Sequence, residues 1–136
     1  DTYPDYEKVI PLDNDKSISI NKKELKEAIK RVSIFSNRST KQITMEAHKT
    51  ELIIKSEDAD SAAKGKETIK CNYSGDEGFK IGFNASFLLE SMACLQKKDM
   101  HIFLKNPLGA TIITEKEETQ KTDKLILLMP IRLNDN

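Results

Sequence analysis

The chain has 136 residues, of which 38% are hydrophobic and 32% are charged. A domain near this size buries roughly two thirds of the surface that its unfolded chain exposes, so one core suffices without disulfides. The 22 basic and 22 acidic residues cancel, and no apolar run approaches the ~18 residues typical of a membrane helix. The start, DTYPDYEK, lacks the basic and then apolar regions of a secretory signal. We therefore expect neither secretion nor membrane insertion.

Acidic and basic residues gather in different segments of the chain, although the net charge is zero. Acidic residues gather in predicted loops at 13–15, 57–60 and 115–118. Cys71 and Cys94 lie in apolar, periodic stretches and lack the spacing of a disulfide framework or a zinc site. We expect both to be reduced core residues of a cytoplasmic protein that holds no metal or cofactor. Basic residues gather in one predicted helix and past its end: Lys22, Lys23, Lys26, Lys30, Arg31 and Arg38.

The first predicted elements are the end of a linker, a strand and a helix. Residues 4–11 begin and end with proline, which is typical of a turn or brief helix at a linker. Ile18 and Ile20 alternate with polar residues as in a strand. Asn21 is a preferred N-cap, with Glu24 three residues on as in a capping box. The helix that follows is expected to bury Leu25, Ala28, Ile29 and Val32.

Three strands are predicted after this helix. Apolar and polar side chains alternate over residues 43–47 and 52–54, on either side of the turn-like segment 48–50, which predicts a hairpin. A third strand is expected near residues 67–73. The segment 74–78 holds two glycines that suit a turn with positive φ.

A second strand and helix follow that turn, in the sequence IGFNASFLLESMACL at residues 81–95. The strand ends at Phe83, and Asn84 again stands at the N-cap position. Further strands are expected at 101–104, 111–113 and 125–133, with a turn at 106–109 and a charged loop at 115–123. The second helix is expected to carry inward Phe87, Leu88, Met92 and Leu95.

The chain repeats its own pattern. Sliding the sequence so that Asn21 falls on Asn84 also places Leu25 on Leu88, so one supersecondary unit is used twice. Each unit reads strand, helix, strand, strand, strand, over about residues 16–73 and 78–133. The pattern predicts an α+β, pseudo-twofold domain over residues 13–136, with residues 1–12 as linker end and domain start. Its two helices are expected to cover one face of antiparallel sheets and leave the other open.

Four segments together resemble one known family. PDYEKVIP at 4–11, YSG at 73–75, IGFNASFLLE at 81–90 and MPIRL at 129–133 are similar in order and spacing to the bacterial DNA polymerase III beta subunit, the replicative sliding clamp. The likeness spans essentially the whole chain. It covers only the third, carboxy-terminal domain of a three-domain family.

This resemblance implies a DNA-clamp fold and a role without bond-making chemistry. In the family, two three-domain chains close head to tail into a ring around duplex DNA, and each domain turns two helices toward the hole. Partners dock by a short QLxLF-type peptide in a groove between the second and third domains. The implied function is a replication processivity factor, a non-catalytic subunit whose partners are double-stranded DNA, the polymerase III alpha subunit, the clamp loader and repair proteins.

The resemblance assigns the peptide groove to the last strand, the linker and residues near them. Exposed Met and Ile side chains beside a rigid Pro would give an adaptable apolar pocket. The alternative is an ordinary edge strand with buried apolar residues, which Pro130 ends. Family members commonly carry hydroxyl groups where Phe87 and Ala110 stand, so one or two polar contacts would be missing. The assigned residues are Pro4, Val9, Asn84, Phe87, Ala110, Leu127, Met129, Pro130, Ile131 and Arg132.

The resemblance also assigns a DNA-facing surface. Lys23, Lys26 and Lys30 share one face of the first helix, where ammonium groups would attract phosphates without reading bases. Lys8 matches a basic family position that approaches the DNA backbone. The alternative is a solvated face in which acidic residues of the same helix pair with the lysines.

A third assignment concerns Ile34 and Phe35, at the end of the first helix. They match family positions that meet the first domain of the other subunit in the ring. An exposed aromatic next to an aliphatic residue suits an interface anchor. The alternative is packing of the helix end into the core.

An enzyme is poorly supported by the sequence. His48 and His101 lack a metal-binding spacing, and residues 57–60 lack the Gly and terminal Glu of a calcium loop. Cys94 lies on an apolar helix face, which favours a structural thiol over a nucleophile. The alternative function is a stand-alone α+β protein-interaction module without a DNA role.

Overall fold

The computed structural model describes residues 14–36, 41–58, 63–115 and 125–133. The predicted linker end at 4–11 and most of the charged loop at 115–123 lie outside these ranges. No helix in the described part has the length and apolarity to cross a membrane. In chain order the elements are β1 (Lys16–Asn21), α1 (Lys22–Ser33), β2 (Gln42–Ala47), β3 (Glu51–Asp58), β4 (Ala63–Lys70), β5 (Asn72–Ser74), β6 (Phe79–Asn84), α2 (Ala85–Ala93), β7 (Asp99–Leu104), β8 (Thr111–Thr114) and β9 (Leu125–Leu128).

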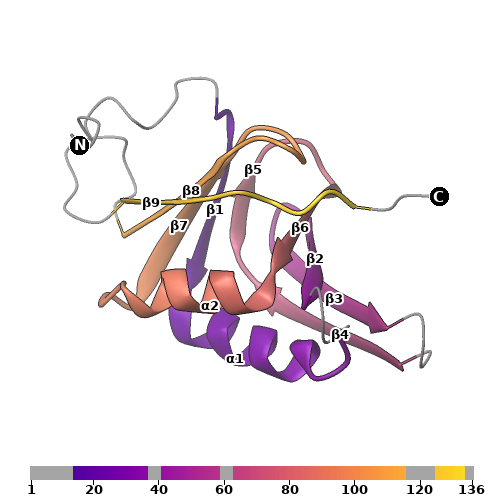
Figure 1. Cartoon of the computed structure of the whole chain (residues 1–136). Helices are drawn as coiled ribbons and strands as arrows, with labels where there is room; N and C mark the ends of the chain where they lie inside the picture. Colours follow the sequence, from indigo (N-terminus) through magenta and orange to yellow (C-terminus); the bar gives the residue numbers. More distant parts are fainter. Residues whose placement is uncertain (1–13, 37–40, 59–62, 116–124, 134–136) are drawn as a thin grey trace, which may run out of the picture.

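The strands form two antiparallel sheets, with the two helices side by side at one end of them (Figure 1). The first sheet has the order β5-β1-β7-β8-β9, and the second has the order β4-β3-β2-β6. Strand, helix and three strands occur in sequence twice, as β1-α1-β2-β3-β4 and as β6-α2-β7-β8-β9. The predicted α+β class with a duplicated unit is therefore confirmed.

The two units exchange their first strands. β1 pairs with β7 of the second unit, where Ile18 lies opposite Ile102, and β6 pairs with β2 of the first unit, where Ile81 lies opposite Met45. All four side chains are buried in one hydrophobic core. Neither unit can therefore complete a sheet without the other, and the domain has one core rather than two.

Both helices begin with the same cap. The side-chain oxygen of Asn21 accepts a hydrogen bond from the Glu24 amide at 2.9 Å, and that of Asn84 accepts one from the Phe87 amide at 3.0 Å. Each asparagine satisfies an amide that the first turn of the helix would leave without a partner. The two N-caps predicted from the sequence are thus present.

Each helix is also tied at its first residue to a strand of the opposite unit. The Lys22 amide donates to the Lys98 carbonyl at 2.7 Å, just before β7, and the Ala85 amide donates to the Lys41 carbonyl at 2.8 Å, just before β2. The two bonds correspond under the internal repeat. They fix the start of α1 against the sheet that contains β1 and β7, and the start of α2 against the sheet that contains β6 and β2.

The inward stripe of α1 is as predicted, whereas that of α2 differs at one position. Ala85, Leu88, Met92 and Leu95 are buried, but Phe87 is 57% exposed, so its predicted inward orientation is wrong. Residues 85, 88 and 92 share one helix face, and successive helix residues turn by about 100°. A side chain one position before Leu88 therefore leaves that face.

The predicted third strand at 67–73 is two strands in different sheets. β4 ends at Lys70 and β5 begins at Asn72, with Cys71 between them. The chain switches sheets at the hairpin turn, where the Cys71 amide donates to the Thr50 carbonyl and the Tyr73 amide to the Lys49 carbonyl. The alternation of Ile69, Cys71 and Tyr73 continues through the switch, so the pattern does not reveal it.

The two cysteines differ in their surroundings. Both are free thiols, and Cys71 is buried as predicted. Cys94 is exposed, which contradicts the prediction that it is a core residue. It follows the last residue of α2, one position before the buried Leu95, and its thiol contacts the Glu90 carbonyl at 3.7 Å.

The segment after β9 connects the two sheets (Figure 1). The Ile131 amide donates to the Gly82 carbonyl of β6 at 2.8 Å, as an isolated antiparallel bridge. A Cβ atom on Gly82 would lie 2.5 Å from Cδ2 of Leu133 and 3.1 Å from the Ile131 carbonyl oxygen. A larger residue at position 82 would therefore force the Leu133 side chain and the Ile131 backbone to shift.

We predict that Gly82→Ala lowers the free energy of unfolding by about 1–3 kcal/mol, because the methyl group would push against the Ile131 backbone. Chemical denaturation of the variant and the parent chain measures the difference. Gly109→Ala is the matched control, because its new Cβ would come no closer than 3.3 Å to its nearest neighbour, the Asn106 side chain, and no backbone atom is among its three nearest contacts. Equal stability of Gly82→Ala and the parent would show that the segment does not press on β6.

Candidate functional site

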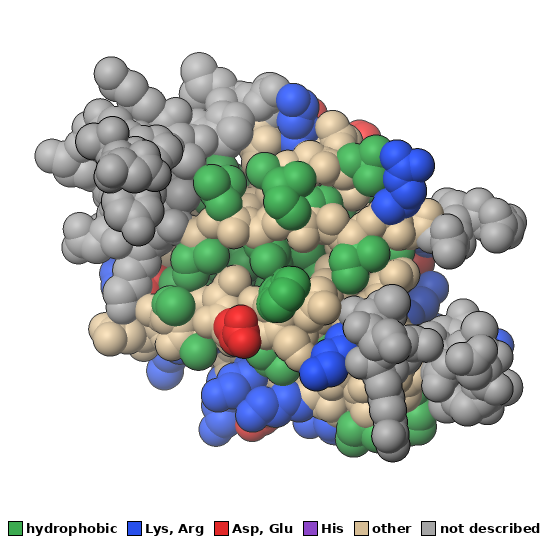
Figure 2. Space-filling model, viewed as in Figure 1, with side chains coloured by type: hydrophobic (Ala, Val, Ile, Leu, Met, Phe, Trp, Pro, Cys, Tyr) green, Lys and Arg blue, Asp and Glu red, His purple; other side chains and the backbone are tan. Residues whose placement is uncertain are grey.

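Three large hydrophobic side chains are exposed on or near α2 and β9, two elements in contact with each other. Phe87 is 57% exposed, Leu127 is 53% exposed and Met129 is 63% exposed. Figure 2 shows hydrophobic side chains gathered over α2 and the last strand on this face of the molecule. An exposed apolar group of this kind is typical of a protein-interaction surface.

The exposed group continues an apolar strip on the side of the first sheet that faces away from the helices. Phe103 lies opposite Ile112, and Ile112 lies opposite Leu127, on three neighbouring strands. Phe103 and Ile112 are buried, although their alternation with core residues turns them away from the main core. The second face of this sheet, which we expected to be open, is therefore partly closed.

A backbone hydrogen bond anchors the last segment, and two of its large apolar side chains remain exposed. β9 ends at Leu128, Pro130 and Ile131 are half-buried, and Arg132 is exposed. Because the anchor is the amide of Ile131, the Met129 side chain stays exposed. The alternative of an ordinary edge strand with buried apolar residues thus fails for Leu127 and Met129.

Two other predicted groove residues have structural contacts of their own. Asn84 is half-buried, and its side-chain oxygen caps α2. Ala110 is half-buried, and its carbonyl accepts a hydrogen bond from the Asn14 side chain at 3.3 Å. Pro4, Val9 and the predicted DNA-facing Lys8 lie outside the described residues, so their roles stay predictions.

The lysine face of α1 is solvated. Lys23, Lys26 and Lys30 are exposed, and none of them forms an ion pair with a described residue. Arg31 on this helix forms an ion pair, through two hydrogen bonds of 3.0 and 3.1 Å to the Glu67 carboxylate on β4. This guanidinium lowers the pKa of Glu67. The lysine charges are therefore available to a polyanion.

Ile34 and Phe35, the predicted interface residues, follow the last residue of α1. Ile34 is 75% exposed and Phe35 is 41% exposed. One side of the Phe35 ring lies against β4, where a Cβ atom on Gly65 would be 2.7 Å from Cδ2 of the ring. β4 is an edge strand of its sheet, so the exposed pair and an open strand edge lie together.

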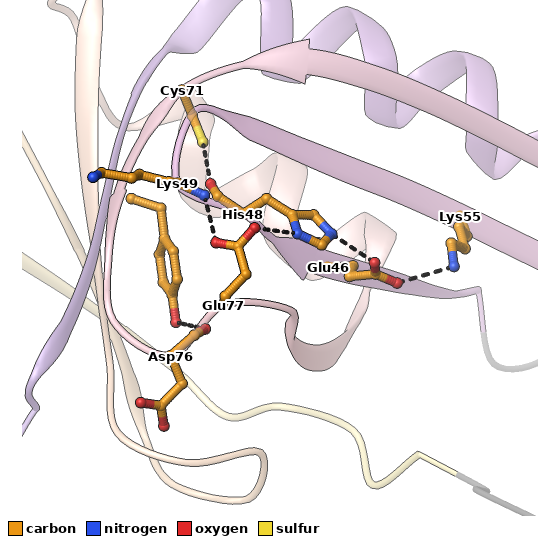
Figure 3. Close-up of polar contacts among 8 residues, drawn as sticks. Glu46, His48, Lys49, Lys55, Cys71, Asp76 and Glu77 are labelled. Atoms are coloured by element: carbon orange, nitrogen blue, oxygen red, sulfur yellow. Dashed lines mark hydrogen bonds and ion pairs between the residues drawn. The ribbon is translucent and has the colours of Figure 1, made fainter.

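A polar cluster surrounds His48 at the turn between β2 and β3 (Figure 3). Its Nε2 atom lies 2.6 Å from the Glu46 carboxylate, and its Nδ1 atom lies 2.8 Å from the Glu77 carboxylate. Glu46 also accepts from Lys55 at 3.1 Å, and Glu77 accepts from the Lys49 amide at 2.9 Å. The cluster ties the hairpin to the turn before β6.

The charges of this cluster shift the pKa values of its members. Hydrogen bonds to Glu46 and then Glu77 raise the pKa of His48. The hydrogen bond to His48 lowers the pKa of Glu46, with help from Lys55, and it also lowers the pKa of Glu77. Both ring nitrogens are hydrogen-bonded to carboxylates, so the imidazole links the hairpin to the turn before β6 and has no free nitrogen to act as a base on a substrate.

No catalytic centre emerges among the described residues. No three His, Cys, Asp or Glu side chains in these ranges are placed to hold a metal ion. His101 is buried in β7, far along the chain from the His48 cluster. Burial and the Glu51 charge raise the pKa of Cys71 to about 11, so its thiolate is scarce at neutral pH.

Two glycines that allow close approach were not predicted from the sequence. Gly65 makes room for Phe35, and Gly82 makes room for the last segment. An isolated glycine inside an alternating strand pattern is a signal of close backbone approach, and Gly82 in IGFN gives that signal. Leu108, in the turn between β7 and β8, is 51% exposed, which was also not predicted.

The comparison with protein families gives one match over most of the chain. Residues 7–132 match the model described as DNA polymerase III beta subunit, C-terminal domain. The beta sliding clamp of Pseudomonas putida KT2440 is 28% identical over 131 residues, which cover 96% of this chain and 34% of the relative. That of Escherichia coli K12 is 27% identical over the same share of each chain. The chain thus spans about a third of the length of these relatives.

Solved structures give the same likeness. The DNA polymerase sliding clamp from Pseudomonas aeruginosa superposes with a TM-score of 0.83 at 26% identity, over 98% of this chain and 36% of that chain. A sliding clamp from the same organism bound to griselimycin also gives 0.83 at 26% identity, over 98% of this chain and 35% of that chain.

We predict that the His48 cluster makes stability depend on pH. Because folding raises the pKa of His48, protonated His48 stabilises the folded state. This stabilisation is fully present below the ordinary histidine pKa of 6.5 and is lost as the pH rises through the raised pKa. The lowered pKa values of Glu46 and Glu77 give stability that is present above 4.5 and is lost on acidification. The His48→Gln substitution should therefore lower the free energy of unfolding most near about pH 5.5 and least above about pH 8.

Denaturation midpoints from about pH 5 to 9 measure this dependence. Lys55→Gln is the control, because it removes the other partner of Glu46 without a group that titrates in this range. Its cost should stay flat with pH. If the loss of stability in His48→Gln were equally independent of pH, it would contradict the stabilising role of the His48 hydrogen bonds.

Proposed function

The chain belongs to the C-terminal domain family of the DNA polymerase III beta subunit, and from this membership we propose that it is one domain of a ring that encircles duplex DNA. The ring would keep a polymerase on its template by enclosure, without catalysis by this chain. We assign the activity to the bacterial cytoplasm, where replication takes place. The observation that carries the proposal is the match over residues 7–132 together with the fold.

The exposed apolar group is the proposed docking surface for peptides of the polymerase III alpha subunit, the clamp loader and repair proteins. Leu127, Met129, Pro130, Ile131 and Arg132 would form one wall, with Phe87 and Ala110 nearby. Support comes from the exposure of Leu127 and Met129 on a segment that the backbone holds in place. A peptide with apolar anchors could bury these side chains without unfolding the segment.

The lysines of α1 are the proposed contacts to DNA. Lys23, Lys26 and Lys30 share one helix face and have no ion-pair partner in the described part of the chain, which suits sequence-independent attraction to phosphates. Ile34 and Phe35 beside the open edge of β4 are the proposed contact to a second chain, which would close the ring as a homodimer. A protein-interaction module alone would not need the lysine face.

We predict that replacing both Leu127 and Met129 with alanine weakens binding of a QLxLF-type peptide by about tenfold or more, because both would anchor it. Fluorescence anisotropy with a labelled peptide measures the affinity. The melting temperature should change little, since both side chains are more than half exposed. Ile34→Ala is the control, because it removes apolar surface of the same kind elsewhere. Equal peptide affinity in the double variant and the parent would remove the groove assignment.

We predict that Lys26→Glu with Lys30→Glu reduces retention on DNA more at low salt than at high salt, because phosphate contacts are screened by ions. The test uses a chimera in which this chain replaces the C-terminal third of the Pseudomonas putida beta sliding clamp. Lys49→Glu with Lys80→Glu is the control, with the same charge change away from α1. A loss that does not depend on salt would argue against phosphate contact.

A further inference from the structure

The structure has a cleft of about 730 Å³. The turn between β7 and β8, which lines it, lies at the end of the strands away from the helices (Figure 1). The cleft is bounded by the turn before β6, by the turn between β7 and β8, and by the last segment of the chain. The lining residues come from both sheets: Lys16, Asp76, Gly78, Phe79, Lys80, Lys105, Asn106, Pro107, Leu108, Arg132 and Leu133. The cleft is therefore the seam where the two sheets meet on this side.

The walls of the cleft include an apolar surface. Phe79, Pro107, Leu108 and Leu133 contribute to it. Leu108 is 51% exposed, at a turn that Asn106 shapes by accepting a hydrogen bond from the Leu108 amide at 2.9 Å. A rigid turn thus presents a large apolar side chain to the cleft.

The charges around the cleft are mostly positive. Lys16, Lys80, Lys105 and Arg132 line it, against the single carboxylate of Asp76. Lys80 and Arg132 are exposed, and neither has an ion-pair partner among the described residues. The cleft therefore carries an excess of positive charge in a chain whose charges sum to zero.

One of these cations is buried. The side chain of Lys16 is 10% exposed, and its ammonium nitrogen lies 5.1 Å from the centre of the Phe79 ring. It donates to the Lys105 carbonyl at 2.8 Å and to the Asp15 carboxylate at 3.1 Å. These contacts hold the turn after β7 against β1, and the Asp15 carboxylate balances the Lys16 charge. The net positive charge of the cleft is therefore carried at its surface, by Lys80 and Arg132.

The cleft adjoins the proposed peptide groove. Arg132 and Leu133 line it, and they directly follow Met129, Pro130 and Ile131 in one extended segment. A peptide that binds along this segment would enter the cleft if it continued by a few residues. The cleft offers that continuation apolar contact and unpaired positive charge.

We propose that the cleft binds an acidic flank of the partner peptide, a short stretch of Asp and Glu residues with an apolar side chain, next to the motif that occupies the groove. This inference rests on the proposed function. Charge complementarity favours an acidic occupant, and the apolar wall favours a peptide. DNA is disfavoured, because α1, which carries the proposed DNA contacts, lies at the other end of the strands (Figure 1).

The test compares two labelled peptides with the same QLxLF-type motif. One carries Asp, Glu and Leu residues beside the motif, and the other carries Ser, Asn and Leu at the same positions. Each is made with the flank before the motif and with the flank after it. On one of the two sides, the acidic flank should strengthen binding about fivefold at low salt, and the gain should shrink at high salt.

Lys80→Glu should remove this gain while leaving the affinity for the neutral-flank peptide unchanged. Lys66→Glu is the matched control, because it makes the same charge change on β4 and should keep the gain. If the acidic and neutral peptides bound equally with the flank on either side of the motif, the cleft proposal would be overturned and the groove assignment would stand. Equal loss in the two variants would show only general attraction and would also overturn it. Failure of both peptides to bind would overturn the groove and the cleft together.

Discussion

The exchange of first strands between the two repeated units is the constraint on which the structure depends. β1 completes the sheet of the second unit and β6 completes that of the first, so each helix starts where a strand has crossed to the other sheet. Paired asparagine caps and paired backbone bonds at the helix starts reinforce the crossing. Both helices are thereby held side by side at one end of the sheets, and the lysine face of α1 is presented as a rigid surface.

The last segment of the chain uses backbone bonding to keep its side chains free. The bridge between Ile131 and Gly82 fixes the path of the segment across the seam of the two sheets. Since a hydrogen bond supplies the anchor, Leu127 and Met129 need not be buried to hold the segment in place. Exposed apolar side chains gain from burial by a partner, so the arrangement suits docking. The same path forms one wall of the basic cleft.

The sequence predicts what depends on neighbouring residues and misses what depends on distant ones. The stripe of α1, the asparagine caps and the hairpin at His48 follow from local spacing and are present. The switch of sheets at Cys71 leaves the alternation intact, so no local pattern marks it. The candidate surfaces came from family resemblance rather than periodicity, because residues 125–129 are an uninterrupted apolar run in which alternation does not distinguish the two faces. The basic cleft joins residues from four parts of the chain, which only tertiary structure brings together.

The most direct measurement is an amide chemical-shift titration of the chain with an unlabelled QLxLF-type peptide. The largest shifts should fall on residues 127–132 and on the first turn of α2, with the lysine face of α1 unmoved. A saturable change confined to those residues would establish that the peptide binds along the last segment of the chain. Shifts centred on α1 or on β4, or none at peptide concentrations near the millimolar range, would contradict it.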